Sequence, residues 1–155
     1  MNPLLNTAYP DPGSSTGFML WQVTNSWQRA MREALTPFNL THVQFVLLAV
    51  LTSLDNSQPI TQKDLATQAG TDTMMTSQVI RTLEAKGLIT RRGHPTDQRA
   101  KTLAPTQAGI RLVNRAIVAV EKADHTYFSP LNNTIEDFTQ SLSTLAETHT
   151  NTQHQ

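Results

Sequence analysis

The chain has 155 residues, of which 38% are hydrophobic, and its formal net charge at pH 7 is zero. This length fits one domain that can bury a hydrophobic core. The sequence contains no cysteine, which excludes a disulfide framework, a thiolate metal site and a thiol redox switch. The longest dense apolar run, 43–51, is too short to cross a bilayer, and no signal peptide precedes it, so we expect a cytoplasmic protein without a membrane partner.

The N-terminal part of the chain predicts an irregular arm followed by a long helix. Residues 1–13 contain three prolines and a glycine, which are typical of irregular structure. From a cap at Ser14 or Ser15, apolar residues recur at spacings of three and four, which predicts an amphipathic helix over 14–36. Its apolar stripe consists of Leu20, Val23, Trp27, Met31 and Ala34.

Residues 41–70 predict two further helices. "THVQ" (Thr41–Gln44) has the form of a capping box, in which a hydroxyl and an amide bond to backbone N–H groups. The helix that it opens is apolar on all sides through Leu54, which predicts a central place in the core. After a loop over 55–59, a short helix begins at Thr61 and ends at Gly70.

The stretch 71–87 predicts a helix that follows the short one after a tight turn. Thr71 or Asp72 is the expected N-cap, and Gly87 is the expected C-cap. Two short alternating segments flank "GHPTDQ" (93–98), which predicts a β-hairpin with a long tip. The short helix, the turn and the second helix form a helix-turn-helix, and the hairpin after it makes the motif winged.

The two faces of the 71–87 helix differ in composition. With Leu83 at the centre of the buried face, a rotation of about 100° per residue places Ile80 on the same side and Met75 on its flank. The outward face then carries Thr73, Met74, Ser77, Gln78 and Arg81. Glutamine can bond adenine, arginine can bond guanine or phosphate, and an apolar side chain can contact the thymine methyl group, so this face suits a DNA major groove. The alternative is an ordinary exposed face.

Two helices at the C-terminus complete the chain, and a polar tail over 149–155 is expected to fray. The first carries a seam of Ile110, Val113, Ile117, Val120 and Tyr127, and the second carries Leu131, Ile135, Phe138, Leu142 and Leu145. The end helices, 14–36 and 106–148, are too long and too apolar on one side for the small core between them. Their seams most simply pair with a second copy of the chain, which predicts a two-fold dimer.

The predicted fold class is therefore mainly α with a small β-hairpin wing. A winged helix-turn-helix over 41–105 lies between N- and C-terminal dimerisation helices, within a single domain over 14–148.

Charge is distributed unevenly along the chain. The segment 81–101 has six basic and two acidic residues, a net charge of +4, whereas 121–155 has one lysine and five acidic residues, a net charge of −4. A compact basic segment is typical of a surface that binds the phosphate backbone of nucleic acid. The net charge of zero argues against such a binder, and charge alone leaves an ordinary solvated face open.

Four motifs follow one another in an order that resembles the MarR family of bacterial transcription regulators. They are "LTHVQFVLLAVL" (40–51), similar to the family's second helix, "TQKDLATQAGTDTMMTSQVIRTLEAKGLITRR" (61–92), similar to its helix-turn-helix, "HPTDQRAK" (94–101), similar to its wing, and "TQAG" (106–109), similar to the start of its fifth helix. The chain departs from the family pattern at Pro105, where a leucine is usual.

The resemblance implies which residues contact DNA. Base contacts fall on Met74, Met75 and Gln78, and Arg99 enters the minor groove with Asp97 orienting its guanidinium. The full candidate set is Thr73, Met74, Met75, Ser77, Gln78, Arg81, Arg91, Asp97, Arg99 and Lys101. The alternative for Asp97 and Arg99 is a surface ion pair that closes the hairpin.

The expected function is that of a dimeric, sequence-specific transcriptional repressor on a pseudo-palindromic DNA operator. The resemblance also implies a small aromatic or amphipathic effector between the dimerisation helices and the winged part. Residues that could line its pocket are Trp21, Phe38, His42 and Phe45, although Trp27 and Phe45 better fit the core, and no ligand residue is assigned. The alternative function is a winged-helix protein-interaction module that does not bind specific DNA.

No catalytic or cofactor motif is recognisable in the sequence. It lacks an activated serine, a Gly-rich phosphate loop and paired carboxylates, so we do not expect an enzyme. His42, His94 and His125 are widely spaced, so we expect no metal site and no cofactor.

Overall fold

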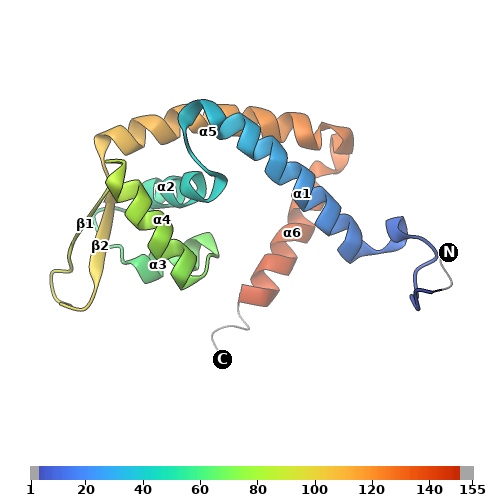
Figure 1. Ribbon diagram of the computed structural model, residues 1–155, viewed down its shortest axis with the longest axis horizontal. Coiled ribbons are helices and arrows are strands. Elements are labelled where there is room, and N and C mark those ends of the chain that lie inside the picture. Colours follow the sequence, from blue (N-terminus) through green and yellow to red (C-terminus); the bar gives the residue numbers. More distant parts are fainter. Residues whose placement is uncertain (1–3, 151–155) are drawn as a thin grey trace.

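The computed structural model describes residues 4–150, and Figure 1 shows their arrangement. The α-helices are α1 (Thr16–Leu35), α2 (His42–Ser53), α3 (Gln62–Ala69), α4 (Thr73–Ala85), α5 (Gln107–Phe128) and α6 (Ile135–Thr150). Between α4 and α5 lies an antiparallel hairpin of β1 (Ile89–Gly93) and β2 (Lys101–Pro105). Three short 3₁₀ segments are η1 (Pro12–Ser14), η2 (Thr36–Phe38) and η3 (Ser129–Thr134). The predicted mainly helical fold with a hairpin is confirmed.

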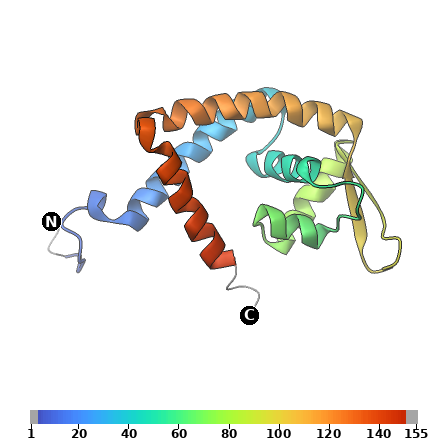
Figure 2. The same cartoon turned by 180° about the vertical axis from the view of Figure 1, so that it is seen from behind.

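The long helix α5 runs from the hairpin to the opposite end of the molecule and joins the two ends (Figures 1 and 2). At one end, α2, α3, α4 and the hairpin form the winged part. At the other end, α1 lies against α5, and α6 turns away from the end of α5. The N-terminal segment and α6 project from the same end of the molecule.

Helix α2 occupies the centre of the core, as its composition predicts. The hydroxyl of Thr41 accepts a hydrogen bond from the Gln44 backbone N–H at 3.2 Å, and Gln44 Oε1 accepts one from the Thr41 N–H at 3.1 Å. This capping box satisfies N–H groups that have no partner inside the helix. Helix α2 contacts α1, α3, α4, α5 and β2. Its buried side chains include Phe45, Leu47, Leu48 and Leu51.

The turn between α3 and α4 is short and held by hydrogen bonds. Gly70 ends α3 with φ at 69°, a left-handed conformation that glycine adopts without steric cost. The side chain of Asp72 accepts a hydrogen bond from the Met75 N–H at 2.8 Å, which caps the start of α4. The hydroxyls of Thr71 and Thr76 lie 2.6 Å apart, and Thr76 is fully buried. These contacts set the direction of α4 relative to α3.

The second strand of the hairpin is bonded to the segment before α3. Register pairs Ile89 with Pro105 and Gly93 with Lys101. The Leu103 N–H donates to the Ile60 carbonyl at 2.8 Å, and Leu103 itself is buried. The departure from the family pattern at Pro105 is accommodated at the last position of β2.

Part of the predicted dimer seam is used inside the chain. Val113 and Val120 of α5 are buried in the core, because α5 packs against both α1 and α2 of its own chain. The Tyr127 hydroxyl donates to the Val23 carbonyl at 3.0 Å. Assigning Val113 and Val120 to contacts with a second copy is therefore wrong, because a side chain already covered has no surface left to offer. The opposite is true of Leu142 and Leu145, which stay exposed on α6.

Two predicted boundaries need correction or lie outside the described residues. Helix α6 continues to Thr150, so residues 149 and 150 are helical and not part of a frayed tail. The rest of that tail, 151–155, and residues 1–3 of the arm lie outside the described residues. The arm over 4–13 is irregular, as predicted, apart from the start of η1.

No single helix of residues 4–150 is long and apolar enough to cross a membrane. The pair Thr16–Phe38 and His42–Ser53, bent by 74°, meets that criterion only by length and composition, as the buried core helix of a folded domain also does.

Candidate DNA-binding surface

Helix α4 has one face anchored in the core and one face turned outward. Thr76, Ile80 and Leu83 are at most 1% exposed, whereas Met74 is 83% exposed. Met75 is 44% exposed, so it lies on the flank as the helical rotation predicts. Thr73, Gln78 and Arg81 are exposed, and Ser77 is half-buried. The adjacent methionines therefore do not form a core pair, and one of them lies fully on the outer face.

One arginine of this face is already held in position. An Arg81 guanidinium nitrogen donates to Ser77 Oγ at 3.1 Å, one turn earlier on the helix. The contact lowers the number of rotamers open to a long side chain, which reduces the entropy lost when that side chain binds a partner. Ser77 therefore positions the Arg81 side chain and need not contact DNA itself.

A single ion pair connects α4 with the hairpin. Arg91 Nε lies 3.2 Å from Glu84 Oε1, and both side chains are about one-third exposed, at 32% and 38%. An exposed pair of this kind contributes at most about 1 kcal/mol to stability. Its position matters more than its energy, because it links the middle of β1 to the last turn of α4. Arg91 thus has a partner inside the chain.

The hairpin tip is shaped by hydrogen bonds to side chains. His94 Nδ1 accepts from the backbone N–H groups of Thr96 and Asp97, each at 3.1 Å. Asp97 Oδ1 accepts from the backbone N–H of Arg99 at 3.0 Å. Among residues 4–150, the structure has no ion pair between Asp97 and Arg99.

In this structure Asp97 has a local role at the hairpin tip, and its predicted role toward Arg99 on DNA stays a prediction. Its carboxylate holds the backbone of the turn and not the guanidinium of Arg99, because an Asp side chain readily reaches the N–H two residues later. The surface ion pair considered as the alternative is equally absent from the described residues. The Arg99 side chain, at the exposed tip, remains available to a partner.

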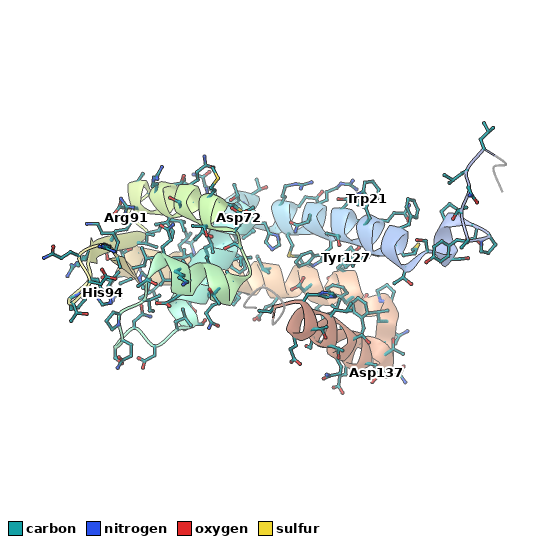
Figure 3. The ribbon with its side chains drawn as sticks, turned by 90° about the horizontal axis from the view of Figure 1, so that it is seen from below. Trp21, Asp72, Arg91, His94, Tyr127 and Asp137 are labelled. Atoms are coloured by element: carbon teal, nitrogen blue, oxygen red, sulfur yellow. The ribbon has the colours of Figure 1, made fainter. Side chains whose placement is uncertain are left out.

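The structure brings most candidate residues to one end of the molecule. Thr73, Met74, Ser77, Gln78 and Arg81 share the outer side of α4, and Arg91 and Lys101 are exposed on the strands of the hairpin. Figure 3 shows Asp72, Arg91 and His94 at this end and Trp21 and Asp137 at the other. The basic segment 81–101 therefore lies at the winged end of the molecule.

One of the residues considered for an effector pocket, Trp21, lies apart from the others. Trp21 is 63% exposed in the N-terminal half of α1, where it stacks on Phe18 at 6.2 Å. Helical rise puts it about 20 Å from the end of α1, whereas Phe38 follows that end and Phe45 is buried in the core. Trp21 is thus excluded from a pocket with the other two.

His42 belongs to a small polar cluster where α1, α2 and α5 meet. Its ring packs edge-on against Trp27 with centroids 5.0 Å apart, and its Nδ1 lies 2.6 Å from Gln28 Oε1. Trp27 Nε1 donates to Asp124 Oδ1 at 2.8 Å. Burial lowers the pKa of His42 from its ordinary value, and the negative charge of Asp124 acts in the opposite direction. Trp27 therefore has the core role that its place in the helix predicts.

Within residues 4–150, no group of three or more His, Cys, Asp or Glu side chains is arranged to hold a metal ion. A hollow of about 810 Å³ lies between the end of α6 and the turn from α3 to α4. It lies between α6 and the winged part, and Ala146, His149 and Thr150 of α6 line it.

Comparison with known proteins agrees with this geometry. The model of the MarR family matches residues 40–101, from just before α2 to the first residue of β2. The uncharacterized HTH-type transcriptional regulator YdcH of Bacillus subtilis (strain 168) is 44% identical over 125 residues, which cover 80% of this chain and 85% of that protein. The chain belongs to the MarR family.

Solved structures share the fold of this MarR-family protein. CouR from Rhodococcus jostii RHA1, solved with p-coumaroyl-CoA, is 26% identical with a TM-score of 0.78, covering 89% of this chain and 96% of that one. MepR of S. aureus, solved with DNA, is 23% identical with a TM-score of 0.78, covering 86% and 98%. The predicted family, the winged helix-turn-helix fold and the function of a transcriptional regulator are confirmed. The individual DNA contacts stay predictions.

Sequence reasoning did not assign a role to two residues that shape this surface. Glu84 is part of the motif that resembles the family, yet its pairing with Arg91 depends on the turn at Gly87 that brings β1 back beside α4. His94 looks like a plain turn residue, and only the folded tip shows its ring accepting two backbone N–H groups. A histidine two and three residues before exposed N–H groups is too common a pattern to have indicated this.

Proposed function

We propose that this MarR-family regulator is a dimeric repressor in which α4 enters the major groove and the hairpin tip enters the minor groove of a pseudo-palindromic operator. The observation that carries the proposal is the outer face of α4. Met74, Gln78 and Arg81 are exposed there while the opposite face is anchored in the core. An anchored helix can hold its outer side chains in fixed register against base edges.

The proposal divides the contacts by chemical role. Gln78 and Arg81 would bond base edges or phosphate, and Met74 and Met75 would contact thymine methyl groups. Arg99 at the hairpin tip would enter a narrow minor groove, where the negative potential is strongest. Thr73, Arg91 and Lys101 would contact the backbone, and Ser77 and Asp97 would position their neighbours.

The proposed dimer uses the end of the molecule opposite the hairpin. Phe18, Leu20 and Trp21 on α1 and Leu142 and Leu145 on α6 are exposed there. Side chains of this kind at helical spacing fit a second copy of the same chain better than water. We propose the domain boundaries accordingly, with 14–36 and 106–148 as dimerisation segments and 41–105 as the DNA-binding part.

Two further parts of the proposal follow from the family. CouR binds p-coumaroyl-CoA, which supports release of this repressor by a small aromatic or amphipathic effector, with no residue yet assigned to it. A regulator that acts on chromosomal DNA works in the cytoplasm of a bacterium, and none of its proposed roles requires catalysis. The alternative of a protein-interaction module is not favoured, because the exposed basic hairpin and α4 face would have no function in it.

A titration of DNA binding tests the proposal. Duplexes selected from a random pool by the unsubstituted protein would be titrated with Arg99→Ala and with Arg111→Ala, which removes an exposed charge from α5. Arg99→Ala should weaken binding by about ten-fold or more and lower the salt dependence, because a phosphate or groove contact is lost. Arg111→Ala should leave both unchanged. Equal affinities for both variants would contradict the minor-groove role of the hairpin.

A further inference from the structure

The end of α4 is held from two sides by residues outside the helix-turn-helix. The helix ends with the Leu88 N–H bonded to the Leu83 carbonyl at 3.0 Å and with Gly87 in a left-handed conformation at φ 74°. This arrangement ends the helix and leaves the carbonyl groups of Gly87 and Leu88 free to contact neighbouring elements. The segment 86–88 is therefore the place where the orientation of α4 can be set from outside.

On one side, Lys86 reaches the joint between α1 and α2. Its Nζ donates to the Asn39 carbonyl at 2.6 Å and to Gln44 Oε1 at 3.1 Å. Asn39 ends η2 with φ at 52°, so its carbonyl marks the bend from α1 into α2. Gln44 Oε1 also accepts from Thr41 in the capping box of α2. One ammonium group thus connects the end of α4 with the end of α1 and the start of α2.

On the other side, the start of α5 lies directly against the same segment. The Thr106 hydroxyl donates to the Gly87 carbonyl at 2.7 Å and accepts from the Gly109 N–H at 3.0 Å. A Cβ at Gly109 would lie 2.1 Å from the Leu88 carbonyl oxygen, closer than any side chain allows. This contact is rigid backbone packing. The Lys86 contact, in contrast, is made by one flexible side chain.

We propose that Lys86 is a positioning residue that sets the angle of α4 relative to α1 and α5. The inference rests on the proposed function, in which α1 and α5 belong to the dimer and α4 contacts DNA. With Thr106 and Gly109 as a pivot, a lost Lys86 contact lets α4 rotate about its end. In a dimer, such a rotation changes the distance between the two recognition helices and hence the half-site spacing that fits them.

Direct contact of Lys86 with DNA is the competing role. It lies at the opposite end of α4 from Met74, and two acceptors within the chain already hold its ammonium group. A phosphate contact would require the side chain to leave both of them.

A spin-label measurement tests the positioning role without DNA. Because the chain has no cysteine, Thr82→Cys on α4 and Glu121→Cys on α5 would carry the only labels, with labelled chains diluted in unlabelled ones. Lys86→Met keeps the aliphatic stem and removes both hydrogen bonds, and Lys86→Arg keeps a donor. We expect a broader or shifted label distance for Lys86→Met and not for Lys86→Arg. An unchanged distance distribution for Lys86→Met overturns the proposal.

A second experiment uses duplexes selected by the unsubstituted protein, with the half-site spacing altered one base pair at a time. Lys86→Met should reduce the preference for the best spacing by about five-fold, within the range by which such contacts modulate coupling between sites. Its salt dependence should stay unchanged. Uniformly weaker binding with a salt slope lower by about one indicates a phosphate contact and overturns the proposal. If the unsubstituted protein selects no sequence, the proposed function fails, and the label distances still decide the role of Lys86.

Discussion

The winged end and the opposite end of this molecule are built from similar helices but differ in how completely they are packed. In the winged end, α2, α3, α4 and both strands contribute buried side chains to one core. In the opposite end, η1, η3 and α6 contain no buried residue. Helix α1 combines both conditions. Its buried side chains, Met31 and Leu35, lie in its last part, and its first part has none.

The comparison shows that an amphipathic pattern predicts a helix but not what covers it. Leu83 on α4 is 1% exposed, whereas Leu145, on a helix of comparable pattern, is 53% exposed. Burial of a leucine side chain is worth about 1.5–3 kcal/mol. The winged end has this stabilisation within one chain, and the other end can obtain it only from a partner.

The largest expected effect tests whether the winged end is as tightly packed as the geometry indicates. Gly109→Ala places a Cβ 2.1 Å from the Leu88 carbonyl, so we expect a loss of about 3 kcal/mol or more in the free energy of unfolding. Gly17→Ala on α1 is the matched control, because a Cβ there meets nothing within 4 Å. It should be neutral or stabilising by up to about 1 kcal/mol. Similar urea midpoints for both variants would remove the contrast between the ends.

The next effect concerns the uncovered end. Leu145→Asp introduces a charge on the exposed face of α6. If a second copy covers that face, the dimer dissociation constant should rise by about 30-fold, corresponding to about 2 kcal/mol. Sedimentation over a range of concentrations measures it. Glu147→Gln, on the same helix, should leave the dimer intact, and an unchanged dissociation constant for Leu145→Asp would place the interface elsewhere.

A smaller effect is expected at the link between α4 and the hairpin. Glu84→Gln removes the ion pair with Arg91. Stability should change by at most about 1 kcal/mol, because the pair is exposed. DNA affinity should fall by about three-fold, since the hairpin is less well held relative to α4. Glu121→Gln on α5 is the control, and a gel-shift titration in which both variants bind equally would show that the pair has no positioning role.

Met74→Ala should affect folding least. Its side chain is 83% exposed, so stability should change by about 0.5 kcal/mol or less. Preference between T·A and other base pairs in the selected duplexes should change by about 1 kcal/mol. Met31→Ala is the contrasting variant, because Met31 is fully buried and its truncation should cost about 2–5 kcal/mol. An unaltered base preference for Met74→Ala would argue against a thymine contact.

The pH dependence of stability tests the polar cluster of His42, Trp27 and Asp124, where α1, α2 and α5 meet. Burial lowers the pKa of His42 in the folded chain below its ordinary value of 6.5. The unfolded chain therefore binds the proton first, and stability should fall as the pH drops through 6.5 towards the folded value. His42→Gln should lack this part of the pH dependence. Urea midpoints at about pH 7.5 and about pH 5 measure it. Identical pH dependence in both proteins would show that His42 makes no such contribution.

Local signals in the sequence predicted most elements of the fold. The capping box at Thr41–Gln44, the glycine that ends α3 and the opposed faces of α4 depend on neighbouring residues, and the structure shows all three. The family resemblance rested on motifs of the same local kind. The division between Met74 and Met75 also followed from helix rotation alone, and it holds in the structure.

Long-range contacts could not be predicted in this way. Nothing near Val113 in sequence indicates that α5 packs against α1 and α2 and so buries this side chain. Lys86 and Asn39 are 47 residues apart. Whether two such groups meet depends on how the helices pack.

The sequence by itself determined the order of the helices, the position of the wing and the outward residues of α4, because helix periodicity and capping act over a few residues. The tertiary structure decided which apolar seams are satisfied within one chain, which arginine is already paired with Glu84, and how α4 is attached to the long helices. Those outcomes depend on packing between distant segments, where a side chain that is covered once can no longer bind a second partner.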